Sequence, residues 1–378
     1  MPLKQTTPSL GVARLPWTTD LNPYQGAVYG ALVDQGVICE ATGDLSTEWL
    51  VAHRSRIDVL HLHWHLERLA DVAPPGAEPA AWVSAQLHRA HDLGYTIAWT
   101  VHEPGRMLLG RDRDEDTVVE ALLRLADVVV THDEPTARYV ADLGRTRWLH
   151  PADVVVAPLG SYGPFVAAGA ATADADLARH RLSIRSGDPV VLSLGAQRWD
   201  KDLPLLLAAV DGLTSDDAVL AIVGPVGDDD ARTVLAGVDP RRVRVLDEWA
   251  SDEFVASCFA LADVAVLARS RPWTSSSLLL ATAHDTPVVA ADLPTNRAMV
   301  GAGGARWFAP GDAGSLTNAL DNALADPAGG RERVRAAQRH AGGTTWDDAA
   351  RVTAEAFRAA VARRAAHVDG AHAAALHA

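Results

Sequence analysis

Short apolar segments of strand type alternate with amphipathic segments of helix type along almost the whole chain. The apolar segments are rich in β-branched residues, which is typical of parallel strands buried on both faces. This alternation predicts an α/β protein built from two Rossmann-like domains, with a comparable series of strands in each half. The predicted strands are 11–15, 37–41, 59–64, 96–101, 128–131 and 154–157, then 190–194, 219–223, 243–246, 264–267, 288–291 and 306–308.

The length of 378 residues exceeds what one ordinary doubly wound sheet needs and suits two domains. A segment rich in Ala, Gly and Asp without strand periodicity interrupts the pattern in the middle of the chain. We therefore expect a first domain, a linker with a short helix, a second domain, a final amphipathic helix and a flexible tail. Their expected ranges are 1–165, 166–187, 188–344, 345–366 and 367–378.

Composition excludes several classes of protein. The formal net charge of -14 lacks the basic footprint that nucleic-acid binding requires. The start, MPLKQTTPSL, has no apolar core of signal-peptide length, and no 18-residue apolar run occurs, so we expect a cytoplasmic protein. Cys39 and Cys258 are too few and too far apart in sequence to indicate a disulfide framework or a metal site.

The stretch 190–201, VVLSLGAQRWDK, joins a buried strand to two cations. Gly195 permits a tight turn, and Arg198 and Lys201 follow at the carboxyl end of the strand, where open α/β sheets bind ligands. This arrangement predicts an anion site. The alternative is a plain strand and loop with two solvated charges.

A run of hydroxyl residues opens a helix in the second half. Thr274, Ser275, Ser276 and Ser277 precede the apolar sequence LLLATA. Capping alone needs one or two hydroxyls, whereas a helix start also attracts phosphate through its N–H groups and dipole. With the two cations counted, we interpret this run as part of a diphosphate site.

Polar side chains also gather at strand ends in the first half. In VLHLHWH, alternation puts His61, His63 and His65 on one strand face. Zinc binding is one interpretation, but straight strand spacing of about 6–7 Å is wide for shared ligation, and no acidic or Cys partner is evident. A polar cleft wall without metal is the preferred interpretation.

The segment TVHEPGR places two groups that can take a proton, His102 and Glu103, at another strand end. The alternative is a polar loop, closed by the following Pro and Gly, in which these two residues have no catalytic role. The loop before the first helix carries Asn22 and Tyr24, which are candidates for an acceptor-binding wall.

The second half resembles glycosyltransferase family four and its relatives, which have the glycosyltransferase-B fold. GAQRWDK is similar to a Gly-x-Ile-Arg-Pro-Tyr-Lys pattern, and TSSSLLLATAHDTPVV to a Thr-Ser-Gly-Ser segment before a proline-led strand. The resemblance implies that Gly195, Arg198, Lys201 and 274–277 bind the diphosphate of the sugar donor. In the first half, NPYQGAVYGAL, HLHWH and TVHEPG resemble the same subgroup.

The resemblance implies two domains facing each other across a cleft, an acceptor site in the first, and a final helix that packs back on that first domain. It also implies a metal-independent hexosyltransferase without a cofactor, moving a sugar from a nucleoside-diphosphate sugar to a small-molecule or lipid-linked acceptor. The family's pair of glutamates is replaced by Pro272 and Leu280. Two alternatives therefore stay open: a sugar-nucleotide 2-epimerase and a non-catalytic nucleotide-sugar-binding relative.

Overall fold

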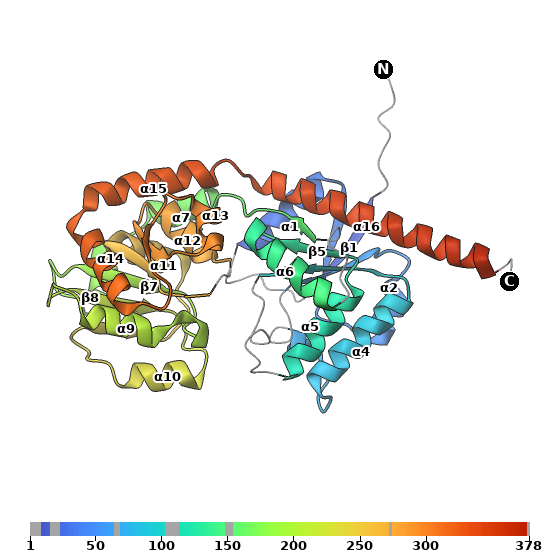
Figure 1. The fold of residues 1–378 in the computed structure, drawn as a ribbon, viewed down its shortest axis with the longest axis horizontal. Helices are drawn as coiled ribbons and strands as arrows, with labels where there is room; N and C mark the ends of the chain where they lie inside the picture. The colour runs from blue at the N-terminus through green and yellow to red at the C-terminus, as the bar shows by residue number, and fades with distance from the viewer. Residues whose placement is uncertain are drawn as a thin grey trace, which may run out of the picture. The chain divides into compact units, whose positions relative to one another are not determined.

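The computed structural model describes residues 9–15, 23–63, 69–102, 113–147, 154–271 and 274–375. The chain divides into two compact units, each described by itself (Figure 1). The first comprises Met1–Gly160 and Thr344–Ala378, and the second Ser161–Gly343. Each unit contains one six-stranded sheet whose neighbouring strands are all parallel. The predicted α/β class is confirmed, and each predicted strand is present with ends correct to within one residue.

The first sheet has the strand order β2-β1-β3-β4-β5-β6. Its strands are β1 (Leu10–Leu15), β2 (Val37–Ala41), β3 (Val59–His63), β4 (Thr96–Thr100), β5 (Val128–Thr131) and β6 (Val154–Val156). The chain leaves β1 toward β2 and returns to β3 on the other side, which makes the β1/β3 junction a topological switch point. Ligands of open α/β sheets bind at such junctions, outside the carboxyl ends of the strands.

Helices cover both faces of the first sheet. One face packs on α1 (Tyr24–Asp34) and α16 (Trp346–Ala375), and the other on α2 (Thr47–His53), α4 (Pro79–Asp92) and α5 (Arg113–Leu125). Figure 1 shows α4 and α5 side by side. Strand alternation decides which side chains meet which layer: Leu60 and Leu62 join the α4/α5 core, while His61 and His63 face α1. The short η1 (Ala70–Val72) and α6 (Glu134–Arg147) complete the unit.

The last helix, α16, belongs to the first unit although it ends the chain. Its apolar face includes Ala349, Val352 and Ala356. It also includes the fully buried Phe357, whose ring meets His61 edge-on at 4.8 Å. The helix continues to Ala375, so the tail expected over 367–378 is wrong for most of its length. The alanine-rich sequence of this segment has a high helix propensity, which favours continuation of the helix.

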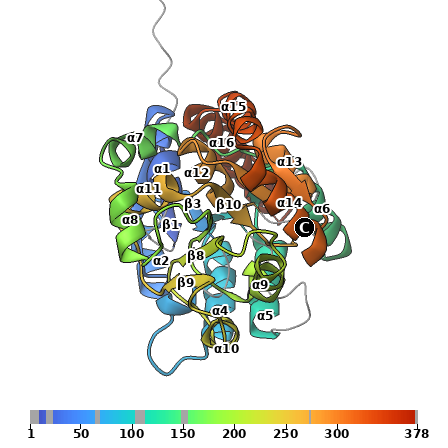
Figure 2. The same ribbon diagram turned by 90° about the vertical axis from the view of Figure 1, so that its left-hand side faces the viewer.

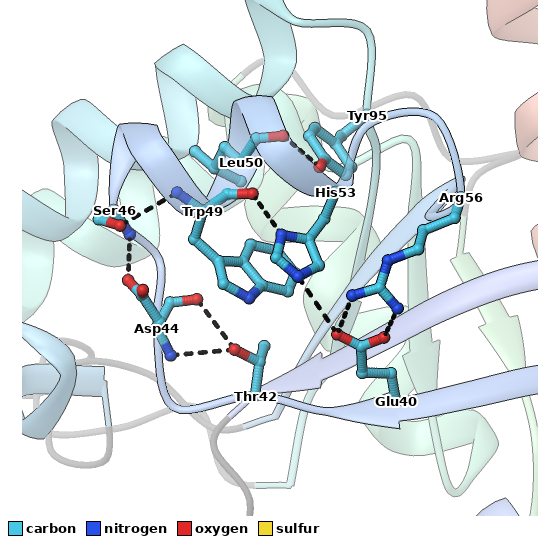
Figure 3. Close-up of polar contacts among 9 residues, drawn as sticks. All are labelled: Glu40, Thr42, Asp44, Ser46, Trp49, Leu50, His53, Arg56 and Tyr95. Atoms are coloured by element: carbon cyan, nitrogen blue, oxygen red, sulfur yellow. Dashed lines mark hydrogen bonds and ion pairs between the residues drawn. The ribbon is translucent and has the colours of Figure 1, made fainter.

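Local polar contacts fix α2 between β2 and β3 (Figure 3). The Ser46 hydroxyl accepts the backbone N–H of Trp49 at 3.2 Å and thereby caps the helix. The buried Tyr95 hydroxyl donates to the Leu50 carbonyl at 2.6 Å, and His53 donates to the Trp49 carbonyl at 2.7 Å. The Ser46 cap therefore fixes the start of α2, and the Tyr95 hydroxyl bonds the body of the helix to the chain just before β4.

The second sheet has the order β12-β11-β10-β7-β8-β9, with its switch point between β7 and β10. Its strands are β7 (Val190–Leu194), β8 (Val219–Val223), β9 (Val243–Leu246), β10 (Val264–Leu267), β11 (Val288–Ala291) and β12 (Arg306–Phe308). Figure 2 shows α8 (Ala175–Arg181) and α11 (Asp252–Leu261) on one side of this sheet and α9 (Leu203–Asp211) and α14 (Ala313–Ala325) on the other. The other helices are η4 (Trp199–Lys201), α10 (Asp229–Ala236), α12 (Ser276–Ala283), α13 (Pro294–Val300) and α15 (Pro327–Ala341).

The expected linker over 166–187 is instead part of the second unit. It contains most of α7 (Gly163–Ala171) and all of α8, and both helices pack on α11. At Gly169 a β-carbon would lie 3.3 Å from the Asp252 carbonyl oxygen, so glycine permits the close approach of α7. The backbone N–H of Asp174 also donates to the Ser257 hydroxyl at 3.0 Å.

Candidate functional site

The turn after β7 creates a small space between a cation and a hydroxyl. Gly195 has a left-handed φ of 104°, which favours glycine. A β-carbon at this position would lie 3.7 Å from Nζ of Lys201 and 4.0 Å from Oγ of Ser277. The glycine therefore keeps the space between the Lys201 ammonium and the Ser277 hydroxyl open.

Neighbouring backbone fixes this turn. At Gly224, after β8, a β-carbon would lie 2.3 Å from the Gly195 carbonyl oxygen, so the two loops approach too closely for any other residue. The fully buried Gln197 donates from Nε2 to the same oxygen at 2.6 Å. The backbone of Gly224 and the side chain of Gln197 therefore both fix the position of Gly195.

A buried carboxylate holds two arginines beside the turn. Asp200 accepts Nε of Arg198 at 3.2 Å and pairs with Nη2 of Arg269 at 2.8 Å, and it is only 1 % exposed. Burial raises the pKa of Asp200, but Arg269, Arg198 and Lys201 outweigh this and hold it below its usual value. The carboxylate is therefore ionised, and the four groups form one charged network.

A second contact joins the loops after β7 and β10, which are adjacent strands. Asp202 adopts a left-handed conformation with φ 46° and ψ 45°, which is uncommon outside glycine. Its carboxylate accepts the backbone N–H of Ser270 at 2.6 Å. Together with the pair between Asp200 and Arg269, this bond fixes both loops at the switch point.

A cavity lies at the carboxyl ends of these two strands. Its polar lining consists of Ser193, Lys201, Arg269, Ser275 and Ser277. Two cations and three hydroxyls in one cavity match the acceptor oxygens and the negative charge of phosphate groups. This lining makes the cavity a candidate anion-binding site.

The hydroxyl run at the start of α12 divides into different roles. Ser275 is the residue before the helix and is buried, yet its side chain caps no backbone N–H among the described residues. Ser276 hydrogen-bonds with Tyr162, a buried tyrosine whose pKa is raised by burial. Thr274 is half-buried and is not among the residues that line the cavity. Only Ser275 and Ser277 of the run therefore reach the cavity.

In the first unit, two histidines of β3 meet a tyrosine of α1. The Tyr29 hydroxyl lies 2.6 Å from Nδ1 of His61 and 2.7 Å from Nε2 of His63. Nε2 of His61 lies 2.7 Å from Oγ1 of Thr100 on β4. All four side chains are buried.

This set continues across the carboxyl edge of the sheet. Nδ1 of His63 lies 3.1 Å from Nε2 of His102, and Nδ1 of His102 lies 3.3 Å from Nε2 of His132. Nδ1 of His132 donates to the Ala157 carbonyl oxygen at 3.0 Å. The ring of Tyr24 packs edge-on against His63, His102 and His132, with centroids 4.8 to 5.7 Å apart.

Burial keeps these rings uncharged. It lowers the pKa of His61 to about 3 and holds the pKa of His63 well below its usual value. Burial also lowers the pKa of His132, against smaller opposing effects of the Ala157 carbonyl and Asp133. His102 is half-buried and is the most accessible of the four histidines.

The structure brings together only part of the expected first-domain set. Tyr24, His63 and His102 are in contact, whereas Asn22, His65 and Glu103 lie outside the described residues. His132 was not among the predicted residues, although it directly follows a predicted strand in the same way as they do. Tyr29 was not predicted either, because the sequence offers no signal for it beyond its place in a helix.

In the second unit, the overlooked residues are Asp200 and Arg269. Both follow strands whose carboxyl ends meet at the switch point, and this position was the available signal. In the described part of the chain, no group of three or more His, Cys, Asp or Glu side chains could hold a metal ion. Among the same residues, no helix is long and apolar enough to cross a membrane.

Comparison with known proteins gives a family for most of the second unit. Residues 188–326 match the family described as glycosyl transferases group 1. No curated protein sequence matches the chain.

Solved structures resemble the chain over nearly its full length. A glycosyltransferase from Rickettsia africae is 11% identical, with a TM-score of 0.66, and the match covers 94% of this chain and 99% of that one. A sucrose-phosphate synthase from Thermosynechococcus elongatus is 18% identical, with a TM-score of 0.65 and coverage of 94% and 100%. The Anabaena protein HepE in complex with UDP-glucose is 12% identical, with a TM-score of 0.66 and coverage of 95% and 100%. The fold is therefore the glycosyltransferase-B fold.

Proposed function

We propose that the protein is a glycosyltransferase that moves a sugar from a nucleoside-diphosphate sugar to a hydroxyl of a small-molecule or lipid-linked acceptor. The observation that carries the proposal is the cavity at the β7/β10 switch point. It presents Lys201, Arg269 and three serine hydroxyls within the segment that matches the group 1 glycosyltransferases. As the bond from sugar to diphosphate breaks, negative charge grows on the diphosphate, and fixed cations stabilise that charge.

In this proposal Lys201 and Ser277 bind the diphosphate beside Gly195. Arg198 contributes through the Asp200 network, and 274–276 complete the start of α12. UDP is the first nucleotide to test, because the similar Anabaena protein was solved with UDP and with UDP-glucose. The site needs no metal to neutralise the donor, since the chain's own cations supply the charge.

The acceptor, in the same proposal, binds at the carboxyl edge of the first sheet. Tyr24 and His63 are buried and would shape the wall of this site from within. Asn22 and His65 would contact the acceptor. If the reaction inverts the sugar's configuration, His102 or Glu103 takes the proton of the acceptor hydroxyl. If it retains the configuration, the leaving diphosphate itself assists.

The deciding experiment measures release of free UDP from UDP-sugars by the full-length protein, with and without a panel of sugar and lipid-linked acceptors. We expect release that depends on an acceptor and persists in the presence of EDTA. The Lys201→Met variant should lose about 100-fold or more in kcat, as enzymes do when one donor to a developing anion is removed. Arg241→Ala is the control, because Arg241 is exposed and pairs only locally with Asp239.

Other outcomes separate the alternatives. Conversion of the sugar nucleotide without an acceptor would indicate the 2-epimerase. Binding of UDP that raises the melting temperature without any turnover would indicate a non-catalytic binding protein. Equal kcat in Lys201→Met and the unmodified protein would contradict the diphosphate assignment.

A further inference from the structure

An arginine lies at the switch point of the first sheet. Arg14 is the second-last residue of β1, so it lies near the carboxyl end of that strand, between β2 and β3. Its register partners are Ala41 on β2 and His61 on β3. Cζ of Arg14 lies 4.6 Å from the centroid of the Tyr29 ring of α1. This ring orients the guanidinium but does not neutralise its charge.

The guanidinium of Arg14 lacks the partners that other enclosed arginines of the unit have. Arg54 donates to three backbone carbonyl oxygens at 2.9 to 3.2 Å, and Arg364 pairs with the Asp127 carboxylate at 3.2 Å. Among the described residues, Arg14 has neither a carbonyl nor a carboxylate acceptor, and its Nε is buried. Withdrawing a charged donor from water without an acceptor costs free energy, so a ligand that supplies one fits this position.

The side chains packed around Arg14 leave its charge uncompensated. Burial lowers the pKa of His61 to about 3 and holds that of His63 well below its usual value. Burial raises the pKa of Cys39 to about 11, against the opposing effect of Arg14, and also raises the pKa of Tyr29. At neutral pH all four groups are therefore uncharged. The end of β1 thus carries a permanent positive charge among neutral side chains.

The β2 side of this guanidinium is open. Register partners on neighbouring parallel strands direct their side chains to the same face of the sheet. Ala41 offers only a methyl group on that face and is itself exposed, and Arg14 is half-buried. On the other side the ring of His61 is buried. An anion can therefore approach the guanidinium past Ala41 without displacing a buried side chain.

We propose that Arg14 binds an anionic group of the acceptor, a phosphate or a carboxylate, at the β1/β3 switch point. This inference rests on the proposed function and names the class of acceptor within it. A guanidinium is a planar fork of donors that meets two oxygens of either group at once. A neutral sugar has no such pair of charged oxygens, so the site distinguishes anionic from neutral acceptors.

The first measurement is binding without turnover. The full-length protein is titrated calorimetrically with inorganic phosphate and with acetate, in a Lys201→Met background that weakens the cavity of the second unit. Adding Arg14→Met retains an unbranched side chain over Tyr29 but removes the donors. We expect the affinity for at least one of the two anions to fall about tenfold or more. Arg138→Met is the matched control, because Arg138 is an exposed arginine of α6 that lies 4.0 Å from Glu134.

A second measurement identifies the anion. Transfer is followed with pairs of acceptors: a sugar with its phosphate ester, and the same sugar with its uronic acid. The unmodified protein should show the higher kcat/KM for the charged member of one pair, which names phosphate or carboxylate as the group bound. Arg14→Met should lose that preference. Arg14→Lys should recover part of it, because the charge returns without the two-donor fork.

Stability separates this role from a structural one. Arg14→Met removes an uncompensated charge, so the melting temperature without ligand should not fall. A lowered melting temperature together with unchanged affinity for both anions would show a structural cation and overturn the inference.

Two further results separate the inference from the proposed function. Transfer to neutral acceptors without any anion binding that depends on Arg14 would overturn the inference and leave the proposed function standing. Anion binding that depends on Arg14, in a protein that transfers no sugar, would contradict the proposed function and leave the anion site standing.

Discussion

At the scale of single residues, the charged network around Asp200 decides the shape of the anion site. Its carboxylate is almost fully buried and lies between two guanidinium groups that are themselves mostly buried. A buried ion pair contributes little net stability when whole, but removing one partner leaves an uncompensated charge. The network therefore matters chiefly for where Arg198 and Arg269 are held.

We expect Asp200→Asn to destabilise the second unit by about 3–5 kcal/mol, because two guanidinium groups lose their carboxylate. Urea unfolding measures this, and the double variant Asp200→Asn/Arg269→Met should recover part of the loss. Strict additivity of the two single variants would contradict coupling between these side chains. Arg241→Ala again provides an exposed control.

The buried histidines predict a pH dependence of stability in the first unit. Their pKa values in the folded protein lie below the ordinary value of 6.5, about 3 for His61. The unfolded chain therefore binds protons first as the pH falls. The stability from neutral burial is complete above pH 6.5 and is lost toward lower pH.

His61 and His63 should each contribute a slope approaching about 1.4 kcal/mol per pH unit below pH 6.5, and His132 acts in the same direction. Urea unfolding of the first unit at pH values from 7.5 to 5 measures the sum. His88→Asn provides a control at an exposed position. A free energy of unfolding that stays constant between these pH values would contradict the lowered pKa values of the buried rings.

At the scale of elements, α2 offers a clean test of how local polar contacts hold a helix. Ser46→Ala removes the side-chain acceptor for the Trp49 N–H and should lower the free energy of unfolding by about 1 kcal/mol. Ser186→Ala, at an exposed turn position, should change it by less than about 0.5 kcal/mol. Equal effects of the two substitutions would show that the cap contributes nothing.

Elements were also the most predictable part of the molecule. Runs such as 190–194 and 219–223 combine β-branching with continuous apolar character, and burial on both faces leaves such a run little alternative to a strand. The prediction of a linker over 166–187 was wrong because alanine and glycine give no periodic hydrophobic signal. Its helices are defined by their packing on α11, which the local sequence does not encode.

At the scale of the whole molecule, the two candidate sites differ in how far the sequence could predict them. The candidate anion site is local in part: Gly195 and Lys201 lie in one stretch, whereas Arg269, Ser275 and Ser277 come from a second stretch after β10. The hydrogen-bonded set of His61, His63, His102, His132 and Tyr29 depends on the strand order β3-β4-β5-β6 and on α1. Its members are therefore far apart in sequence. Tyr29 and His132 become recognisable only once that order is known.

The division into units predicts how the protein can be cut. Ser161–Gly343 is continuous and should fold alone, whereas 1–160 lacks α16 and should not. Phe357 and the alanines of α16 cover a face of the first sheet that would otherwise meet water. Joining Gly160 to Thr344 through a short Gly-Ser bridge should restore folding, because Gly160 lies directly against Trp346.

Circular dichroism and thermal unfolding of the three pieces measure this outcome. The bridged first unit and the isolated second unit should each melt cooperatively. A cooperative transition for 1–160 alone would contradict the role given to α16.

The return of α16 has a consequence for biosynthesis. The ribosome makes the first sheet before the second unit, yet the helix that covers one of its faces emerges only after the second unit. The second unit is complete before that and can fold while the nascent chain is still attached. During that interval one apolar face of the first sheet lacks the helix that packs on it in the finished protein. We therefore expect chaperones that bind exposed apolar surface to bind the unfinished chain.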